Sequence, residues 1–133
     1  MERPNAYNLA VQNRYEETSE SEYLRLNSKY LKGAEKLLAK KDYPQASEKL
    51  WGAFVEAVKV LAIKQGISLE TYGSIAEFIS RLHRKHPEWN LTNAFKHAEN
   101  LHVNFYENHL PEDHIMESKK VLEESIRLML ESE

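Results

Sequence analysis

The fold is decided by residues 30–65, "YLKGAEKLLAKKDYPQASEKLWGAFVEAVKVLAIKQ". Apolar side chains recur at helical spacing on both sides of a turn at residues 40–43, and Pro44 suits the first turn of a second helix. In this second helix, Trp51 and Val55 widen the apolar stripe into a second face. A helix that is apolar on more than one side is buried on more than one side. We therefore predict a helical hairpin whose second helix is the central element of the protein or also meets a partner chain.

Helical periodicity continues on either side of this hairpin. Ser19 and Glu22 have the spacing of a capping box, so the first helix is expected to begin there and to reach Ala39. Further helices are predicted at residues 72–86, from 91 to about 107, and from Pro111 to the end of the chain. No stretch shows the sustained alternation that is typical of a strand.

These patterns predict an all-α fold, an up-and-down bundle of four to five helices. Residues 1–17 lack a clear apolar stripe and are expected to be an N-terminal tail or a short helix. Residues 18–133 are expected to form a single domain, because a chain of 133 residues has the length of one domain.

The composition excludes several classes of protein. The net charge of −3 argues against broad attraction to nucleic acid, although a local basic patch remains open, and Arg81, Arg84 and Lys85 form the densest basic stretch. The chain has no cysteine, which excludes disulfides, thiolate zinc sites and a cysteine nucleophile. No apolar run is long enough to cross a membrane, and no signal peptide is visible. We expect a cytoplasmic protein without membrane association.

The hairpin is also similar to one tetratricopeptide (TPR) unit, which joins two amphipathic helices through a turn of this type. Such units must repeat in order to bury their faces, and no second copy follows in the sequence. A TPR-like adaptor that only holds another protein is therefore an alternative function.

A more specific resemblance rests on two stretches, "AEKLLAKKDYPQASEKLWGAFVEAVKVLA" (34–62) and "AENLHVNFYENHL" (98–110), followed by a closing amphipathic helix. Together they resemble the HEPN superfamily (higher eukaryotes and prokaryotes nucleotide-binding) and, within it, the archaeal PaREP branch. The resemblance implies a helical bundle that is often paired as a symmetric dimer. Many members are metal-independent ribonucleases of toxin–antitoxin systems, and others are inactive nucleotide- or RNA-binding modules. An antitoxin or a nucleotidyltransferase is the partner that such systems imply.

The catalytic signature of that superfamily is an arginine followed, after four to six residues, by a histidine at the entry to the last helix. In this sequence His102 stands at the arginine position and His109 is the next histidine. Arg81 and His86 have the literal spacing but lie one helix too early. Two histidines can act as base and acid, but a neutral imidazole does not replace a guanidinium on phosphate.

The candidate catalytic residues are thus His102 and His109, and the candidate ligand-binding residues are Asn104, Tyr106, Glu107 and Lys59. Simpler interpretations stay open for two of them. His102 lies on an apolar stripe and suits a hydrogen-bonded interior histidine, and Lys59 is spaced for an ion pair with Glu56.

The histidine spacings do not suggest a metal site. His83 and His86 share a helix face, but the other pairs are splayed apart and no His-Glu-x-x-His pattern is present. We expect neither a metal nor a cofactor.

Three functions follow from these observations. The first is a homodimeric HEPN-like protein that binds nucleotide, RNA or a protein partner without efficient catalysis. The second is an active metal-independent ribonuclease toxin, and the third is the TPR-like adaptor.

Overall fold

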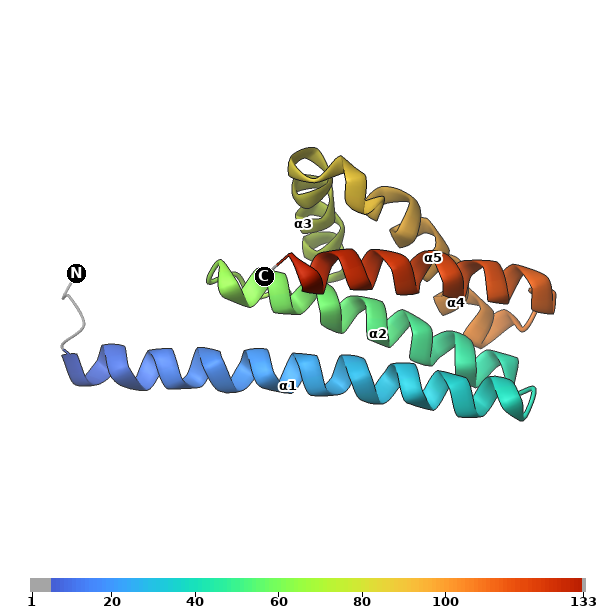
Figure 1. The fold of residues 1–133 in the computed structure, drawn as a ribbon, viewed down its shortest axis with the longest axis horizontal. Helices are drawn as coiled ribbons and strands as arrows, with labels where there is room; N and C mark the ends of the chain where they lie inside the picture. Colours follow the sequence, from blue (N-terminus) through green and yellow to red (C-terminus); the bar gives the residue numbers. More distant parts are fainter. Residues whose placement is uncertain (1–5, 133) are drawn as a thin grey trace.

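The computed structural model describes residues 6–132, with side chains from residue 19 onward, and it contains five α-helices and one short 3-10 helix (Figure 1). The elements are α1 (Ala6–Ala39), α2 (Tyr43–Lys64), α3 (Tyr72–Lys85), η1 (Pro87–Trp89), α4 (Leu91–Glu107) and α5 (Glu112–Glu131). Residues 6–132 contain no strand, so the predicted all-α fold is confirmed. The helices from α2 to α5 begin and end within a residue or two of the predicted bounds.

Helix α2 is the central element, as predicted. It packs against α1, α3, α4 and α5, and Figure 1 shows it between α1 and α5. Phe54, Ala57 and Val58 on α2 are completely buried. On its second face Val55 is buried and Trp51 is half-buried. Neighbouring helices alone therefore cover most of α2, and the homodimer remains a prediction.

Helix α1 begins well before the predicted position. It runs without interruption from Ala6, so Ser19 and Glu22 lie inside it and form no cap. A capping-box spacing does not start a helix when the preceding residues also adopt helical geometry. Residues 1–5 lie outside the described part of the chain, and the predicted domain boundary near residue 18 stays a prediction.

The turn between α1 and α2 is built from local signals. Lys41 adopts a left-handed conformation with φ of 60°, and the Asp42 carboxylate accepts a hydrogen bond from the backbone N–H of Gln45 at 3.3 Å. Pro44 lies in the first turn of α2, where its missing N–H costs nothing. This turn returns the chain alongside α1.

Helix α1 is joined to α2 by a buried hydrogen bond and by a close aromatic contact, among other contacts. The Asn27 side chain, which is buried, donates to the backbone carbonyl of Ala53 at 2.6 Å. The Tyr30 ring lies directly on the backbone at Gly52, where a Cβ atom would be 3.0 Å from the ring. Glycine inside a helix costs stability relative to alanine, so this close approach explains its presence at position 52.

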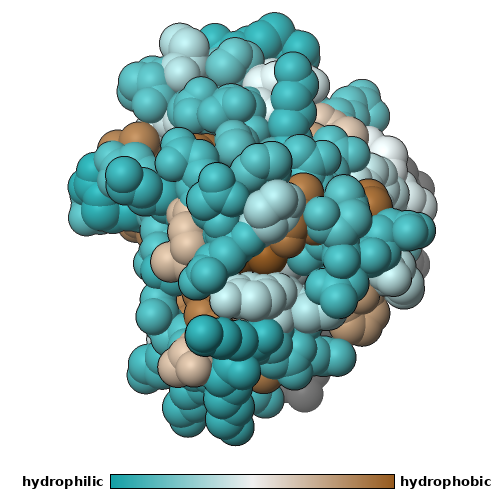
Figure 2. Space-filling view, turned by 90° about the vertical axis from the view of Figure 1, so that its right-hand side faces the viewer, coloured by the Kyte–Doolittle hydropathy of each residue, from teal (hydrophilic) through white to brown (hydrophobic). Residues whose placement is uncertain are grey.

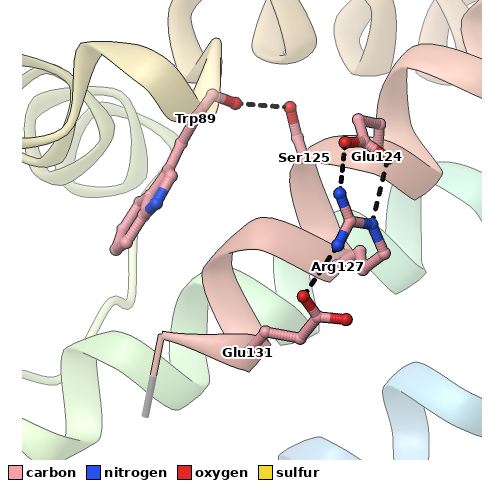
Figure 3. A network of polar contacts seen from close by, with 5 residues as sticks. All are labelled: Trp89, Glu124, Ser125, Arg127 and Glu131. Carbon is pink, nitrogen blue, oxygen red and sulfur yellow. Dashed lines mark hydrogen bonds and ion pairs between the residues drawn. The ribbon is translucent and has the colours of Figure 1, made fainter.

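Helix α5 is joined to η1 by a buried hydrogen bond (Figure 3). The Ser125 hydroxyl donates to the backbone carbonyl of Trp89 at 2.8 Å. On the exposed side of the same helix, Arg127 forms ion pairs with Glu124 and Glu131. Such exposed pairs contribute little, so the buried bond and the apolar core hold α5 in place.

Among the described residues, no helix combines the length and the apolar character that a membrane span requires.

Gly33 in α1 and Gly52 in α2 provide a test of the α1–α2 contact. Gly33→Ala is expected to stabilise the protein by about 0.5 to 1 kcal/mol, because its Cβ would meet only Lys49 carbons at 3.8 Å. Gly52→Ala is expected to give no such gain, because the Tyr30 ring must move aside. Urea unfolding of both variants measures the difference, and equal stabilisation of the two would contradict the proposed packing.

Candidate ligand-binding site

The corner between α4 and α5 is closed by a buried asparagine. Asn104 is fully buried, and its side-chain oxygen accepts hydrogen bonds from the backbone N–H groups of His109 and Leu110, each at 2.8 Å. Its side-chain nitrogen donates to the Ser47 hydroxyl at 3.0 Å. Asn104 was predicted to contact a ligand, but the structure gives its amide a structural task, because it satisfies the backbone where α4 ends.

Replacing this asparagine tests that task. Asn104→Ala is expected to destabilise the protein by about 3 kcal/mol, since two backbone N–H groups and a buried hydroxyl lose their partner. Asn100→Ala is the matched control on the same helix, at an exposed position, and should change stability by about 0.5 kcal/mol or less. Equal effects in thermal unfolding would rule out this role of Asn104.

His102 is held by a carboxylate and an indole. Its Nδ1 lies 2.9 Å from Oε2 of Glu48, and its ring stacks on Trp51 with 4.7 Å between ring centroids. The His102 side chain is 30% exposed. The His102 ring is hydrogen-bonded and packed, as an interior histidine would be. It still reaches solvent, as a catalytic histidine would have to.

His109 does not join His102 in one network. It is exposed in the connection after α4, and only its backbone N–H is bonded, to Asn104. Within residues 19–132 the His109 ring makes no hydrogen bond, ion pair or ring contact. The structure thus shows no interaction that would couple the two predicted catalytic histidines.

The other predicted ligand residues lie in two different places. Tyr106 is 71% exposed, with its ring edge-on to His102 at 5.7 Å, and Glu107 is exposed at the end of α4. Lys59 instead lies about 16 Å further along α2 than Glu48, from the helical rise per residue. There its Nζ is 3.7 Å from Glu56 and above the Tyr23 ring, so the predicted alternative of an ion pair within the helix is present.

Arg81 and His86 contact different aromatic residues and not each other. The Arg81 guanidinium lies over the Phe78 ring, and the His86 ring stacks on Trp89 at 3.8 Å. The literal Arg-x4-His spacing therefore does not form a site in this chain.

Trp51 is the centre of an aromatic cluster that the sequence did not reveal. Tyr72 stacks on it at 5.6 Å, and the Tyr72 hydroxyl donates to Glu99 at 2.6 Å. Burial and this hydrogen bond to a carboxylate raise the pKa of Tyr72. Glu48 and Glu99 lie beside this aromatic cluster, so the surface around His102 is acidic and aromatic.

A hollow of about 250 Å³ opens between α1 and α2 next to this cluster. Glu48, Gly52 and Glu56 follow one another at intervals of four residues, so they share one face of α2 and line the hollow. Tyr30 and Trp51 add aromatic walls.

A larger groove of about 600 Å³ continues along α1 on the other side of Tyr30. Its lining includes five basic side chains, those of Arg25, Lys29, Lys32, Lys36 and Lys49. We call it the basic groove. The four on α1 are three or four residues apart, which places them on one helix face. This spacing was the signal available in the sequence, but the local density of charge pointed to residues 81–85 instead.

The cations of the basic groove differ in how far they are neutralised. Arg25 is paired with Glu22 at 2.6 Å, and the Lys49 ammonium lies over the Tyr30 ring at 5.1 Å. Lys32 and Lys36 form no ion pair with any described residue. Positive charge therefore remains available for an anion.

A separate hollow of about 460 Å³ lies at the α4–α5 corner. It is lined by His97, His114, Asp113 and Ser118, and Nδ1 of His97 lies 2.8 Å from the Ser118 hydroxyl. Figure 2, which views this end of the molecule, shows a mostly hydrophilic surface with a few hydrophobic residues in its middle. In the described part of the chain, no three His, Asp or Glu side chains come together in a way that could hold a metal ion.

Glu56 is an unusual residue in the smaller hollow. The residue is 9% exposed, and its buried Oε2 has no hydrogen-bond partner within the described chain. Burial raises the pKa of the Glu56 carboxyl, and the neighbouring Lys59 ammonium opposes the shift. The structure thus keeps a carboxylate where the protein alone does not satisfy it.

The raised pKa has a consequence for stability. The protonated carboxyl is the form that the fold favours, so its contribution is complete below the ordinary value of 4.5 and is lost as the pH rises through the raised pKa. Glu56→Gln is therefore expected to raise the melting temperature at pH 7 and to have less effect near pH 4. Glu117→Gln, at an exposed position, is the control and should change neither value. A lower melting temperature of Glu56→Gln at pH 7 would show that the Lys59 pair outweighs burial.

The fold and these surfaces define a small helical-bundle protein with a histidine–carboxylate pair and a basic groove. Residues 22–126 match the model of the archaeal PaREP1/PaREP8 family, and the chain belongs to this family. It is also similar to a protein from Sulfolobus solfataricus with a known crystal structure, at 25% identity and a TM-score of 0.72. That similarity covers 80% of this chain and 95% of the other. No curated protein matches the chain. The predicted resemblance to the PaREP branch is confirmed.

Proposed function

We propose that this protein binds RNA or nucleotides through the basic groove and does not cleave them efficiently. The observation that carries the proposal is the row of basic side chains along one face of α1, beside Tyr30 and Lys49. A chain with a net charge of −3 has concentrated positive charge on this face.

Phosphate is the ligand chemistry that this groove suits. Lysine ammonium groups bind phosphate oxygens as point charges, and each contact releases counterions from a nucleic acid. Lys32 and Lys36 are free of ion pairs to described residues, so binding a phosphate costs them no existing partner. The groove runs along the helix axis, which suits a chain of phosphates better than a single anion.

The surroundings of His102 argue against cleavage. A ribonuclease of the HEPN type needs a fixed cation where the phosphate is cleaved, and here a carboxylate lies 2.9 Å from the His102 ring. The negative charge of Glu48 would repel a phosphate at this position. The ring of His109, the second histidine of the motif, makes no contact with residues 19–132 that would position it for proton transfer.

A charge reversal in the basic groove tests the proposal. The double variant Lys32→Glu/Lys36→Glu is expected to bind a labelled single-stranded RNA of mixed sequence about tenfold more weakly or worse, because two phosphate contacts are lost. In a plot of the logarithm of the binding constant against the logarithm of the salt concentration, the magnitude of the slope should fall by about two, one for each lost phosphate contact. Fluorescence anisotropy across a salt series measures both quantities.

The matched control is Lys96→Glu/Lys120→Glu, which makes the same charge change at exposed positions on α4 and α5. Equal weakening by the two double variants would show that only net charge matters, and the proposal would fail.

The alternative functions predict other outcomes. RNA cleavage that disappears in His102→Ala and in His109→Ala would support the active ribonuclease instead. If neither the wild-type protein nor the control variant binds RNA, the result would favour the TPR-like adaptor. The homodimer and an antitoxin or nucleotidyltransferase partner stay predictions, which sedimentation and co-purification test.

A further inference from the structure

Helices α2, α3 and α4 together present a face that carries aromatic rings and carboxylates. We call it the acidic aromatic face, and it consists of Glu48, Trp51, Tyr72, Glu99, His102 and Tyr106. The His102 and Tyr72 rings both stack on Trp51. Because His102 is bonded to Glu48 and Tyr72 is bonded to Glu99, a carboxylate accompanies each of these two rings.

The surrounding helices leave this face open. Glu99, Val103 and Tyr106 are three or four residues apart, so they share one face of α4. Tyr106 is 71% exposed, and Val103 and Tyr72 are exposed as well. These are three of the five large apolar side chains that are exposed within residues 19–132. Exposed apolar side chains that gather on one face mark an interaction site.

The two carboxylates are not neutralised by the protein. Oε2 of Glu48 is bonded to His102, and Oε2 of Glu99 accepts from the Tyr72 hydroxyl, but neither Oε1 atom accepts a hydrogen bond within residues 19–132. No described lysine or arginine forms an ion pair with Glu48 or Glu99. The Glu48 side chain is 32% exposed, so a cation can approach it from solvent.

This charge determines which kind of partner can cover the face. A nucleic acid would bring phosphates close to the two carboxylates, which repel them. A symmetric dimer formed through this face would place the same carboxylates of two copies opposite each other, because both subunits of such a dimer use one patch. A cationic partner meets neither cost.

Arginine is the cation that the face suits best. Its planar guanidinium stacks on an exposed aromatic ring such as that of Tyr106, and its N–H groups form a fork that matches a carboxylate. A lysine ammonium is strongly hydrated and pairs only as a point charge. The aromatic row separates Glu48 from Glu99, so a segment with more than one arginine matches the face.

We propose that the acidic aromatic face docks an arginine-bearing segment of a partner protein. The Tyr106 ring is the stacking surface, and Glu48 and Glu99 are the ion-pair partners. This interaction goes beyond the proposed binding of RNA or nucleotides, because it uses a different surface from the basic groove.

Two labelled peptides of equal charge test the proposal. Both consist of glycine and serine, and one carries three arginines where the other carries three lysines. In fluorescence anisotropy, wild type is expected to bind the arginine peptide about fivefold more tightly than the lysine peptide, because only a guanidinium both stacks and forms the fork. Equal binding of the two peptides, or no binding of the arginine peptide, would overturn the proposal.

Substitutions of the exposed tyrosine assign the preference to this face. Tyr106→Ala is expected to reduce the ratio of arginine-peptide to lysine-peptide affinity to about one, whereas Tyr106→Phe keeps the ring and should keep the ratio. Tyr106 is exposed, so neither change disturbs the core, and circular dichroism confirms that both variants are folded. A preference that survives in folded Tyr106→Ala would show that arginine is recognised elsewhere.

A carboxylate variant tests the ion pair. Glu48→Gln is expected to weaken binding of the arginine peptide about threefold, because one ion pair is lost. Glu117→Gln makes the same change of charge at an exposed position on α5 and should leave the affinity almost unchanged. Equal weakening by the two variants would show that only net charge matters.

Two further measurements separate this proposal from its alternatives. Lys32→Glu/Lys36→Glu should keep the preference for the arginine peptide, so docking and RNA binding in the basic groove succeed or fail independently. Sedimentation of wild type and Tyr106→Ala tests the other occupant of the face. A dimer that Tyr106→Ala dissociates would show that a second copy covers the face, and the proposal would be wrong.

Discussion

The burial of α2 on several sides is the constraint from which the rest of the structure follows. Because Phe54, Ala57 and Val58 must all be removed from water, other helices have to surround α2. The face that α1 covers is special, since Gly52 lets the Tyr30 ring approach the α2 backbone. Glycine at position 52 lowers the stability of the helix by about 1 kcal/mol relative to alanine. The same contact separates the basic groove from the smaller hollow, so packing and the proposed site share one residue pair.

Buried polar side chains determine where the helices end and how they dock. Asn27 bonds the backbone of α2, Ser125 bonds the backbone of η1, and Asn104 bonds the two N–H groups that follow α4. Each of these groups satisfies a backbone atom that would otherwise be buried without a partner. The polar stretch that resembles a ribonuclease motif therefore also has a structural role, because its Asn104 side chain is buried and bonds the backbone where α4 ends.

Acidic and basic side chains lie on different faces of the molecule. Carboxylates of Glu48 and Glu99 lie around His102 and Trp51, whereas lysines on α1 form the basic groove on the other side of Tyr30. A net charge of −3 describes the sum of these faces and not any one of them. This separation of charge supports the proposed function, since lysines attract a phosphate and carboxylates repel it.

The sequence by itself determined the bundle, the central position of α2 and the bounds of the last four helices, because helical periodicity, Pro44 and the turn at residues 40–43 are local signals. The resemblance to the HEPN superfamily also implies an arginine at the position where this sequence has His102. The predicted start of α1 was wrong because a capping pattern can lie inside a continuing helix. Only the tertiary structure decided that Asn104 is buried, that Glu48 and Trp51 hold His102, and that Tyr30 rests on Gly52 between two hollows. These contacts join residues far apart in the chain, and no local pattern specifies which helix faces meet.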